Sequence, residues 1–412
     1  MRLLIIGVTL LGLLFFRFFL FYDKSDLPQD GEQISFRSTL FSEPKIYQSY
    51  QRIEVDYQGK EKIFVFANIY PEYHYGDSLS ISGRVKYRLL NNGDNFISMS
   101  YPKIEAVKTS ENYFLAFISL VRQKIISLFQ KSMPVKSASL LLGIVFGIKE
   151  TMPKDFSDNL KNAGVMHVIA ASGMNVTLVG GFISSIMVFF VKRRLALFIS
   201  IFGILFYAIL SGLESSIIRA AIMGILTFSA QILGRQRLAA FALLLTGYGM
   251  LFFRPNLLFD IGFQLSFVST AGILYIKPII EINKGIKMIL NKSIIGEEAV
   301  TTISAQAAAL PILIANFGTY SLWSVLVNIL VIWTIPILMI LGGVGAILGI
   351  LIIPIGKIFL FFSVPLLIYF EMVVNFFAEQ GVVKIESISW PFILGYYCIL
   401  FSLIYMIKRN SE

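Results

Sequence analysis

Three features that many enzymes use are scarce or missing in this chain, and each absence excludes a class of function. One cysteine, Cys398, occurs among 412 residues, so neither an intrachain disulfide nor a thiolate metal cluster is expected. Two histidines, His74 and His167, cannot supply a multi-histidine metal site, which excludes most zinc hydrolase chemistry. The sequence also lacks a Gly-x-x-x-x-Gly-Lys-Ser/Thr phosphate loop, so we expect any ATP-driven motor to be another protein.

Charged residues are few as well. They make up 15% of the chain, against about 25% in soluble domains. Hydrophobic residues make up 56%, and the mean hydropathy is +0.75. Thirty-seven Phe and eighteen Tyr suit lipid-facing and interfacial positions. This composition predicts a membrane protein with several spans.

The net charge of +10 is unevenly distributed. Residues 23–111 contain eleven basic and thirteen acidic side chains, so the basic excess lies in the apolar remainder. Part of that excess is the ordinary bias of cytoplasmic loops toward Lys and Arg. Basicity alone is therefore weak evidence for a nucleic-acid partner.

The hydropathy pattern divides the chain into four segments. Residues 1–22 predict an uncleaved transmembrane anchor, because no small-x-small cleavage site precedes Asp23; a signal peptide is the alternative. A polar segment follows at 23–111, and residues 112–136 predict an amphipathic helix in the membrane interface. Residues 137–412 predict a polytopic membrane domain. The fold class is thus mostly α, a bundle with about ten crossings.

The polar segment predicts a small β-barrel of OB type, inserted after the first helix. Short β-branched and aromatic stretches alternate with turn signals; they lie at 34–40, 47–57, 63–67, 79–88, 96–100 and 103–107. Arg84, Lys86 and Arg88 share one strand face and are the candidate DNA-binding residues, because OB folds often bind single strands through basic grooves. The segment's net charge of −2 favours the alternative, a structural or protein-docking barrel.

The interfacial helix has charged positions at Arg122, Lys124 and Lys131, which we expect to face away from the apolar side. Residues 137–148 are too few to cross a bilayer at about 20 residues per span, so they predict a re-entrant segment.

Loop charges orient the predicted spans. Basic residues recur at alternate loops, which puts these loops and both termini in the cytoplasm and the β domain outside. The loop charges lie at 192–194, 235–237, 277–292, 357 and 408–409. The spans lie at 165–191, 195–212, 216–234, 238–253, 257–277, 298–316, 321–352 (broken near Pro336), 357–378 and 388–407.

Polar side chains recur inside these spans, where hydrocarbon offers them no partner. By the predicted topology, His167, Arg219 and Asp260 fall near the outer membrane end, whereas Gln306 and Asn328 fall near mid-span. We interpret the set as a polar substrate pathway that narrows inward. Its members are His167, Ser172, Asn175, Arg219, Asp260, Gln264, Ser266, Gln306 and Asn328.

Structural roles are open for the same residues. Arg219 has counter-charges within reach in Asp260 or Glu214, or it can snorkel to the interface. The amide side chains can join helices by hydrogen bonds. Pro311 and Pro336 predict broken helices, which are tolerated where backbone lines a cavity.

Four motifs carry a family resemblance. Residues 167–176 (His-Val-Ile-Ala-Ala-Ser-Gly-Met-Asn-Val) resemble a stretch typical of the ComEC family of bacterial competence proteins. Further matches are residues 216–221 (Ser-Ile-Ile-Arg-Ala-Ala), 260–267 (Asp-Ile-Gly-Phe-Gln-Leu-Ser-Phe) and 304–311 (Ser-Ala-Gln-Ala-Ala-Ala-Leu-Pro). The resemblance implies a channel that imports single-stranded DNA across the bacterial cytoplasmic (inner) membrane during transformation. It also implies a DNA receptor, a nuclease and a cytoplasmic helicase-like ATPase as separate partners, and a homo-oligomer as one possible state. No catalytic residue, metal or cofactor is expected.

Three departures from the family pattern are visible. Asn175 stands where a second histidine is common, and the β segment has no cysteine for the disulfide of some relatives. Many relatives continue into a metallo-β-lactamase-like domain, whereas this sequence stops at Glu412, which predicts a truncated form.

Two other functions are open. The chain could carry another polar solute or act as an envelope scaffold. Alternatively, Ser172 and His167 could form the nucleophile–base pair of an intramembrane hydrolase. On a continuous helix, however, five residues turn about 140° and would point these two side chains apart.

Overall fold

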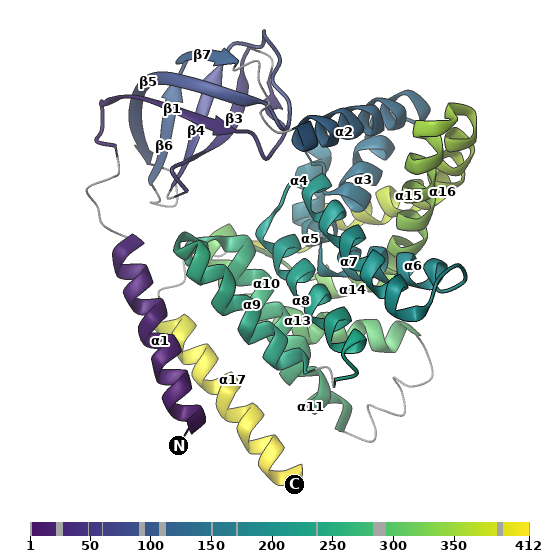
Figure 1. Cartoon of the computed structure of the whole chain (residues 1–412). Helices are drawn as coiled ribbons and strands as arrows, with labels where there is room; N and C mark the ends of the chain where they lie inside the picture. Colours follow the sequence, from purple (N-terminus) through teal and green to yellow (C-terminus); the bar gives the residue numbers. More distant parts are fainter. Residues whose placement is uncertain are drawn as a thin grey trace. The chain divides into compact units, whose positions relative to one another are not determined.

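The computed structural model describes most of the chain as two compact units (Figure 1). One unit comprises Met1–Ser127 and Tyr248–Leu258, and the other comprises Leu128–Gly247 and Phe259–Glu412. The described residues are 2–21, 28–47, 49–59, 61–89, 95–106, 113–149, 151–169, 172–235, 238–282, 294–384 and 390–411. The end of the predicted strand at 107, the turn at 91–94 and most of the basic loop at 277–292 lie outside these ranges.

The predicted fold class is confirmed. In the described parts of the chain, seven helical stretches are long and apolar enough to cross a membrane, and the chain is a multi-pass membrane protein; the first stretch is described only on either side of residues 170–171. They are Met166–Met187, Arg193–Leu210, Ser215–Ile232, Ile261–Glu281, Gly296–Phe317, Thr334–Leu351 and Ile353–Ala378. Three other predicted spans correspond to the shorter apolar helices Gly7–Phe21, Ala239–Phe253 and Pro391–Ile407.

The first unit joins helix α1 (Arg2–Phe21) to a curled sheet. Its strands are β1 (Gln33–Thr39), β2 (Lys45–Ile46), β3 (Gln51–Tyr57), β4 (Glu61–Ala67), β5 (Ser78–Leu89), β6 (Asn95–Ser100) and β7 (Lys103–Ala106). They agree closely with the predicted strands, with one correction. The predicted strand at 47–57 begins only at Gln51, because the Tyr47 amide donates to the Tyr50 carbonyl at 2.8 Å in the turn that joins β2 to β3.

The sheet curls because β5 is long enough to pair with different neighbours along its length (Figure 1). The first part of β5 pairs with β1 and β7, and its second part pairs with β6, which also runs parallel to β4. Where β1 meets β3, Ser38 Oγ donates to the Asp56 carbonyl at 3.1 Å. Alternate residues such as Ile53, Val65 and Val85 face inward and form the core.

Helix α2 (Tyr113–Ser132) is the predicted amphipathic helix, but the position predicted for Arg122 is wrong. Arg122 is only 2% exposed; its Nε lies 3.3 Å from Glu43 Oε1, and its guanidinium covers the Tyr75 ring at 4.8 Å. Burial raises the pKa of the Tyr75 phenol, and the adjacent guanidinium opposes that shift. The first part of α2 is therefore packed against the sheet by a buried ion pair, rather than presenting Arg122 to water.

The second unit is almost entirely helical. Its helices before the undescribed residues 283–293 are α3 (Val135–Phe146), α4 (Lys154–Asn162), α5 (Met166–Ile169), α6 (Gly173–Met187), α7 (Arg193–Leu210), α8 (Ser215–Ile232), α9 (Ala239–Phe253, shared between the units), α10 (Ile261–Tyr275) and α11 (Lys277–Ile282). A short 3-10 helix, η2 (Pro255–Phe259), precedes α10. The later elements are α13 (Ile294–Phe317), β8 (Thr319–Ser321), α14 (Ser324–Ile332), α15 (Thr334–Leu351), α16 (Ile353–Ala378), β9 (Val382–Lys384) and α17 (Trp390–Ser411).

Helix α3, the segment predicted to be re-entrant, lies inside this unit. Its residues from Ser137 to Phe146 are buried, although hydrophobic side chains on a lipid-facing helix would be exposed in the isolated chain. Gly143 and Gly342 allow close approach, because a Cβ on them would collide with Ile169 and Val145. Ser137 Oγ also donates to Glu371 Oε1 at 2.9 Å, which ties α3 to α16.

Breaks in the helices agree only partly with the prediction. The long predicted span at 321–352 is broken as expected, since α14 ends at Ile332 and α15 begins at Thr334, near Pro336. Pro311, however, lies inside the continuous helix α13, so the predicted break there is wrong. Neighbouring helices can compensate for a proline in a membrane helix. An unpredicted break occurs at Ser172, whose backbone is extended between α5 and α6.

Candidate functional site

Six elements of the second unit form a ring, in which each element contacts the next or is joined to it by the chain. Helix α6 contacts α8, α8 contacts α10, α10 contacts α13, and α13 contacts α14. Helix α14 then meets the turn at Gly164, which leads through α5 back to α6. Every residue of the predicted pathway lies on one of these elements or at its first turn. The order of contacts therefore collects residues that are up to 161 positions apart in sequence.

Small residues let the elements of this ring approach closely. A Cβ on Gly272 of α10 would lie 2.5 Å from the Ser304 carbonyl oxygen of α13. A Cβ on Gly164 would collide with Ser324 and come within 3.1 Å of the Ser321 Cβ. Close approach through small residues is the usual way in which membrane helices associate.

The first polar cluster surrounds the start of α6. Ser172 stands at the N-cap position but does not cap the helix; its Oγ donates instead to Asn175 Oδ1 at 3.2 Å. Asn175 is fully buried, and its Nδ2 donates to the Ile144 carbonyl at 2.7 Å. The carboxamide that replaces the family's second histidine thus ties α6 to α3.

Arg219 on α8 lies against the same helix start. It is 8% exposed, and its Nη2 is 2.9 Å from the point that a Cβ on Gly173 would occupy. Its Nη1 donates to Thr270 Oγ1 of α10 and lies 3.9 Å from Met223 Sδ. Its Nε has no hydrogen-bond partner among the described residues.

The two carboxylates considered as partners of Arg219, those of Asp260 and Glu214, bind other groups. Asp260 caps α10, since its Oδ1 accepts from the Phe263 amide at 2.7 Å and from Ser215 Oγ at 2.6 Å. Glu214 pairs with Lys149 at 2.7 Å. The predicted ion pair is therefore wrong: in the described part of the chain, no carboxylate lies within ion-pair distance of the Arg219 guanidinium.

A second polar cluster lies where α13 meets α14. Gln306 Oε1 accepts from Ser324 Oγ and from the Tyr320 hydroxyl, both at 3.2 Å. One turn beyond Ser324, Asn328 is fully buried, and neither its Nδ2 nor its Oδ1 has a partner in the described structure. Buried amides are normally hydrogen-bonded, so this one is a candidate for contact with a polar ligand.

The remaining predicted residues lie between the two clusters. Gln264 and Ser266 are half-buried on α10, and the Ser266 carbonyl accepts from Thr270 Oγ1 at 2.8 Å. His167 is exposed on α5 and hydrogen-bonds the backbone of Gly164. Ser172 and Asn175 are thus hydrogen-bonded to each other and Arg219 lies against the adjacent Gly173, whereas Gln306 and Asn328 share the other cluster. No group of three or more His, Cys, Asp or Glu that could hold a metal occurs among the described residues.

The geometry also bears on the hydrolase alternative. The angular argument against a Ser172–His167 pair assumed a continuous helix, and the extended backbone at Ser172 makes that assumption wrong. What the structure gives instead is a hydrogen bond from the Ser172 hydroxyl to an amide oxygen, which cannot act as a general base.

The outer side of the curled sheet carries a second candidate surface. Arg84, Lys86 and Arg88 are exposed on β5, and the Val85 between them is buried. The Arg88 guanidinium lies over the Phe66 ring of β4 at 5.6 Å. We call six outward residues of β3 to β6 the aromatic–basic face; they are Arg52, Phe64, Phe66, Lys86, Arg88 and Phe96. Glu54 lies on the same side of β3 and pairs with Arg52 at 3.2 Å.

The aromatic members of this face are the residues that the sequence reasoning missed. Arg52 lies over Phe64 at 5.2 Å, and Phe64 meets Phe96 edge-on at 5.7 Å. Tyr50 extends the row, with its ring 5.5 Å from Phe66. The signal was present in the sequence, because Phe64 and Phe66 flank the inward-facing Val65 and must face outward on a strand.

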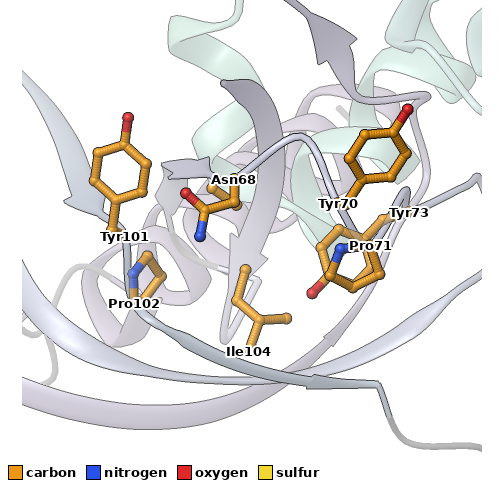
Figure 2. Close-up of a pocket in the computed structure, with 8 residues that line it drawn as sticks. Asn68, Tyr70, Pro71, Tyr73, Tyr101, Pro102 and Ile104 are labelled. Atoms are coloured by element: carbon orange, nitrogen blue, oxygen red, sulfur yellow. The ribbon is translucent and has the colours of Figure 1, made fainter. Parts of the chain in front are cut away.

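A shallow hollow lies beside this face, at the ends of β4 and β6 (Figure 2). Tyr70 and Tyr101 stand on opposite sides of it, and Asn68 lies between them. Both tyrosines are well exposed, at 75% and 58%. Gln51 Nε2 holds the loop in place by donating to the Asn68 and Pro71 carbonyls at 2.6 and 2.7 Å. The hollow is therefore bordered by two exposed aromatic rings.

Comparison with known proteins agrees with the motifs. A family model described as competence protein matches residues 144–410. ComE operon protein 3 from Bacillus subtilis (strain 168) is 27% identical over 269 residues, which cover 64% of this chain and 33% of that protein. The chain thus spans about a third of the length of this curated relative. No solved structure matches. The family model covers more than half of the sequence, and the chain accordingly belongs to the ComEC family of competence proteins.

Proposed function

We propose that the second unit is a channel that conducts single-stranded DNA inward across the bacterial cytoplasmic membrane during natural transformation. The observation that carries the proposal is Arg219, a buried cation without a carboxylate partner in the described structure, set in a ring of helices whose other pathway residues are mostly neutral. Membership of the competence family and the name of the Bacillus subtilis relative support DNA uptake as its context.

The polarity of the wall suits a charged polymer that must keep moving. Each nucleotide carries one phosphate into a region of low dielectric constant, where an unpaired charge is strongly disfavoured. Neutral donors such as Ser172, Gln306 and Asn328 can replace part of the hydration of that phosphate. Conduction also requires binding weak enough for release, and a wall lined with many cations would hold the strand. One cation among neutral donors meets both conditions.

The aromatic–basic face is proposed as a first contact for the unpaired strand. Stacking of a base on an aromatic side chain contributes about 1–3 kcal/mol and tolerates any sequence. Phe66 and Phe64 offer such rings, and Arg88 and Arg52 stand over them, close to where phosphates would pass. Since the domain as a whole is slightly acidic, attraction to the face would be local rather than general.

The orientation in the membrane is part of the proposal. Basic residues at 192–194, 235 and 357 lie at helix ends, and the tendency of such residues to stay in the cytoplasm supports cytoplasmic termini and an outer β domain. Delivery of DNA to the face and hydrolysis of the second strand are assigned to a separate receptor and nuclease. Pulling from the cytoplasm is assigned to a helicase-like ATPase. A homo-oligomer is compatible with this scheme.

Deleting the gene in its competent host tests the proposal against both alternatives. We expect transformation by marker DNA to fall to background, while DNA still binds at the cell surface and remains sensitive to added nuclease. Complementation by the wild-type gene is the control for polar effects. A transporter of another solute, an envelope scaffold or a hydrolase predicts unchanged transformation, and that result would overturn the proposal.

A further inference from the structure

We infer that Arg219 and the N-terminus of α6 together form an oxyanion site, which takes one phosphodiester group of the passing strand. The identity of the anion rests on the proposed function, whereas the existence of the site rests on geometry alone. The site has three parts: the first amides of α6, the Arg219 guanidinium and the Gly173 that lets them meet.

The N-terminal end of α6 has no side-chain cap. The helix has 15 residues and starts at Gly173. The first amides of a helix have no partner inside the helix, and a side chain at the N-cap usually accepts from one of them. Ser172 does not, because its hydroxyl is turned to Asn175. The Asn175 and Val176 amides donate to the Ser172 carbonyl at 3.1 and 3.4 Å, so the donor capacity that remains among the described residues belongs to the Gly173 and Met174 amides. The helix start also carries a partial positive charge of about half a unit.

The Arg219 guanidinium lies against this positive end of α6. Nη2 of Arg219 would be 2.9 Å from a Cβ on Gly173, and Arg219 is 92% buried. Two positive groups in one poorly hydrated place repel each other. A buried cation without a counter-charge is also costly in itself. An anion between the two would remove both penalties, so this arrangement is explained by a ligand and not by folding stability.

The donor groups at this place indicate the chemistry of the ligand. A guanidinium presents a planar fork of donors that matches the oxygens of a phosphate, and helix N-termini bind phosphate through backbone amides. The Nε of Arg219 has no partner among the described residues and is available to such a fork. Asp260, held by Ser215 one turn before Arg219 on α8, adds a nearby negative charge. That charge opposes tight binding, as a translocation pathway requires.

The anion site can be tested on the purified full-length protein in lipid nanodiscs. The probes are inorganic phosphate and a short oligothymidylate, and the readout is the rise in melting temperature with probe concentration at constant ionic strength, because a ligand that binds the folded state stabilises it. We expect Arg219→Gln to weaken binding of both probes by about ten- to hundredfold, the range for a charged hydrogen bond. Gly173→Ala should weaken it through displacement of the guanidinium.

Two matched variants serve as controls. Arg235→Gln removes an exposed arginine just beyond the end of α8, and Gly181→Ala adds a Cβ in open space on α6. Both should bind the probes like wild type. If Arg219→Gln and Gly173→Ala also bind like wild type, or if all four variants weaken binding equally, the anion site is refuted.

The outcomes separate this inference from the proposed function. Phosphate binding that depends on Arg219, combined with unchanged transformation in the gene deletion, would leave the anion site standing and overturn DNA conduction. In the reverse pattern, the gene deletion abolishes transformation, and the probes bind equally well to wild type and to Arg219→Gln. That result would overturn the anion site and support the channel.

Discussion

Two buried arginines, one in each unit, show how differently the two regions use the same side chain. Arg122 in the first unit is 2% exposed, pairs with Glu43 at 3.3 Å and covers the Tyr75 ring. Arg219 in the second unit is 8% exposed, and a hydroxyl and a thioether stand where a carboxylate is expected. The first arrangement satisfies its charge within the fold. The second has no carboxylate partner in the described structure, and we propose that a ligand supplies the missing negative charge.

Two buried amides, one in each unit, also differ in how far they are hydrogen-bonded. Gln51 in the first unit donates through Nε2 to the carbonyls of Asn68, Ile69 and Pro71. Asn328 in the second unit is fully buried, and neither atom of its amide has a described partner. The sheet domain thus satisfies the donor group of this amide, although Gln51 Oε1 has no described partner, whereas both polar atoms of Asn328 are without one.

We expect the largest loss of stability from removing the ion pair between Arg122 and Glu43. Arg122→Ala leaves the Glu43 carboxylate buried without its partner, and the loss of a buried pair costs about 3–5 kcal/mol. We expect a clear fall in the melting temperature of the full-length protein in detergent. The double variant Arg122→Met with Glu43→Leu should recover much of the loss. A single variant as stable as wild type would show that the pair does not hold α2 to the sheet.

The close approach of α10 and α13 offers a second, smaller effect. Gly272→Ala brings a Cβ within 2.5 Å of the Ser304 carbonyl oxygen, and overpacking of this kind costs about 1–3 kcal/mol. The melting temperature should fall, and transformation should fall with it, because the ring has to widen at this point. Gly343→Ala on α15, where nothing lies within 4 Å, is the matched control. Equal behaviour of the two variants would contradict the ring geometry.

The aromatic–basic face predicts a binding effect without a stability effect. Phe66→Ala removes a half-exposed ring, so we expect affinity for a single-stranded oligonucleotide to drop by about 1–3 kcal/mol at an unchanged melting temperature. Phe41→Ala, at a ring that is 39% exposed outside the face, should leave affinity intact. Titration of the oligonucleotide by fluorescence anisotropy measures both. Equal affinity for both variants would leave the face with a structural or protein-docking role.

The smallest expected effect concerns Asn328. Replacing a buried amide that lacks partners by an apolar side chain of similar size removes a desolvation penalty of about 1–3 kcal/mol, part of which returns as imperfect packing. Asn328→Leu should therefore be as stable as wild type or slightly more stable, but should transform less well. A destabilised variant would mean that the amide has a structural partner after all.

Local patterns explain how much of the fold was predictable. The strands followed from alternation of apolar and polar residues between turn signals, as in β4, where Ile63, Val65 and Ala67 face inward. The hairpin at 47–50 was missed, since aromatic residues continue through the turn. The break at Ser172 was missed as well, because Ala-Ala-Ser-Gly is compatible with a membrane helix.

The partners of the site residues were less predictable, for a physical reason. Spacing along one helix gives the face on which a side chain lies, but not which residue of another helix stands opposite. Asp260 and Arg219 are near in predicted depth, yet helix capping takes up the Asp260 carboxylate. Likewise, helical periodicity assigns Arg122 to a polar face, and only the sheet supplies the Glu43 that buries it.

Arg219 is proposed to serve a ligand and not the fold, and one paired measurement tests this proposal most directly. Transformation frequency and melting temperature should be determined for Arg219→Leu, with Arg122→Leu as the reference. We predict a melting temperature for Arg219→Leu at or above that of wild type, together with a loss of transformation of about tenfold or more, as expected when a charged hydrogen bond to the strand is removed. A protein that is as destabilised as Arg122→Leu, and that transforms in proportion to the amount remaining in the membrane, would contradict the claim.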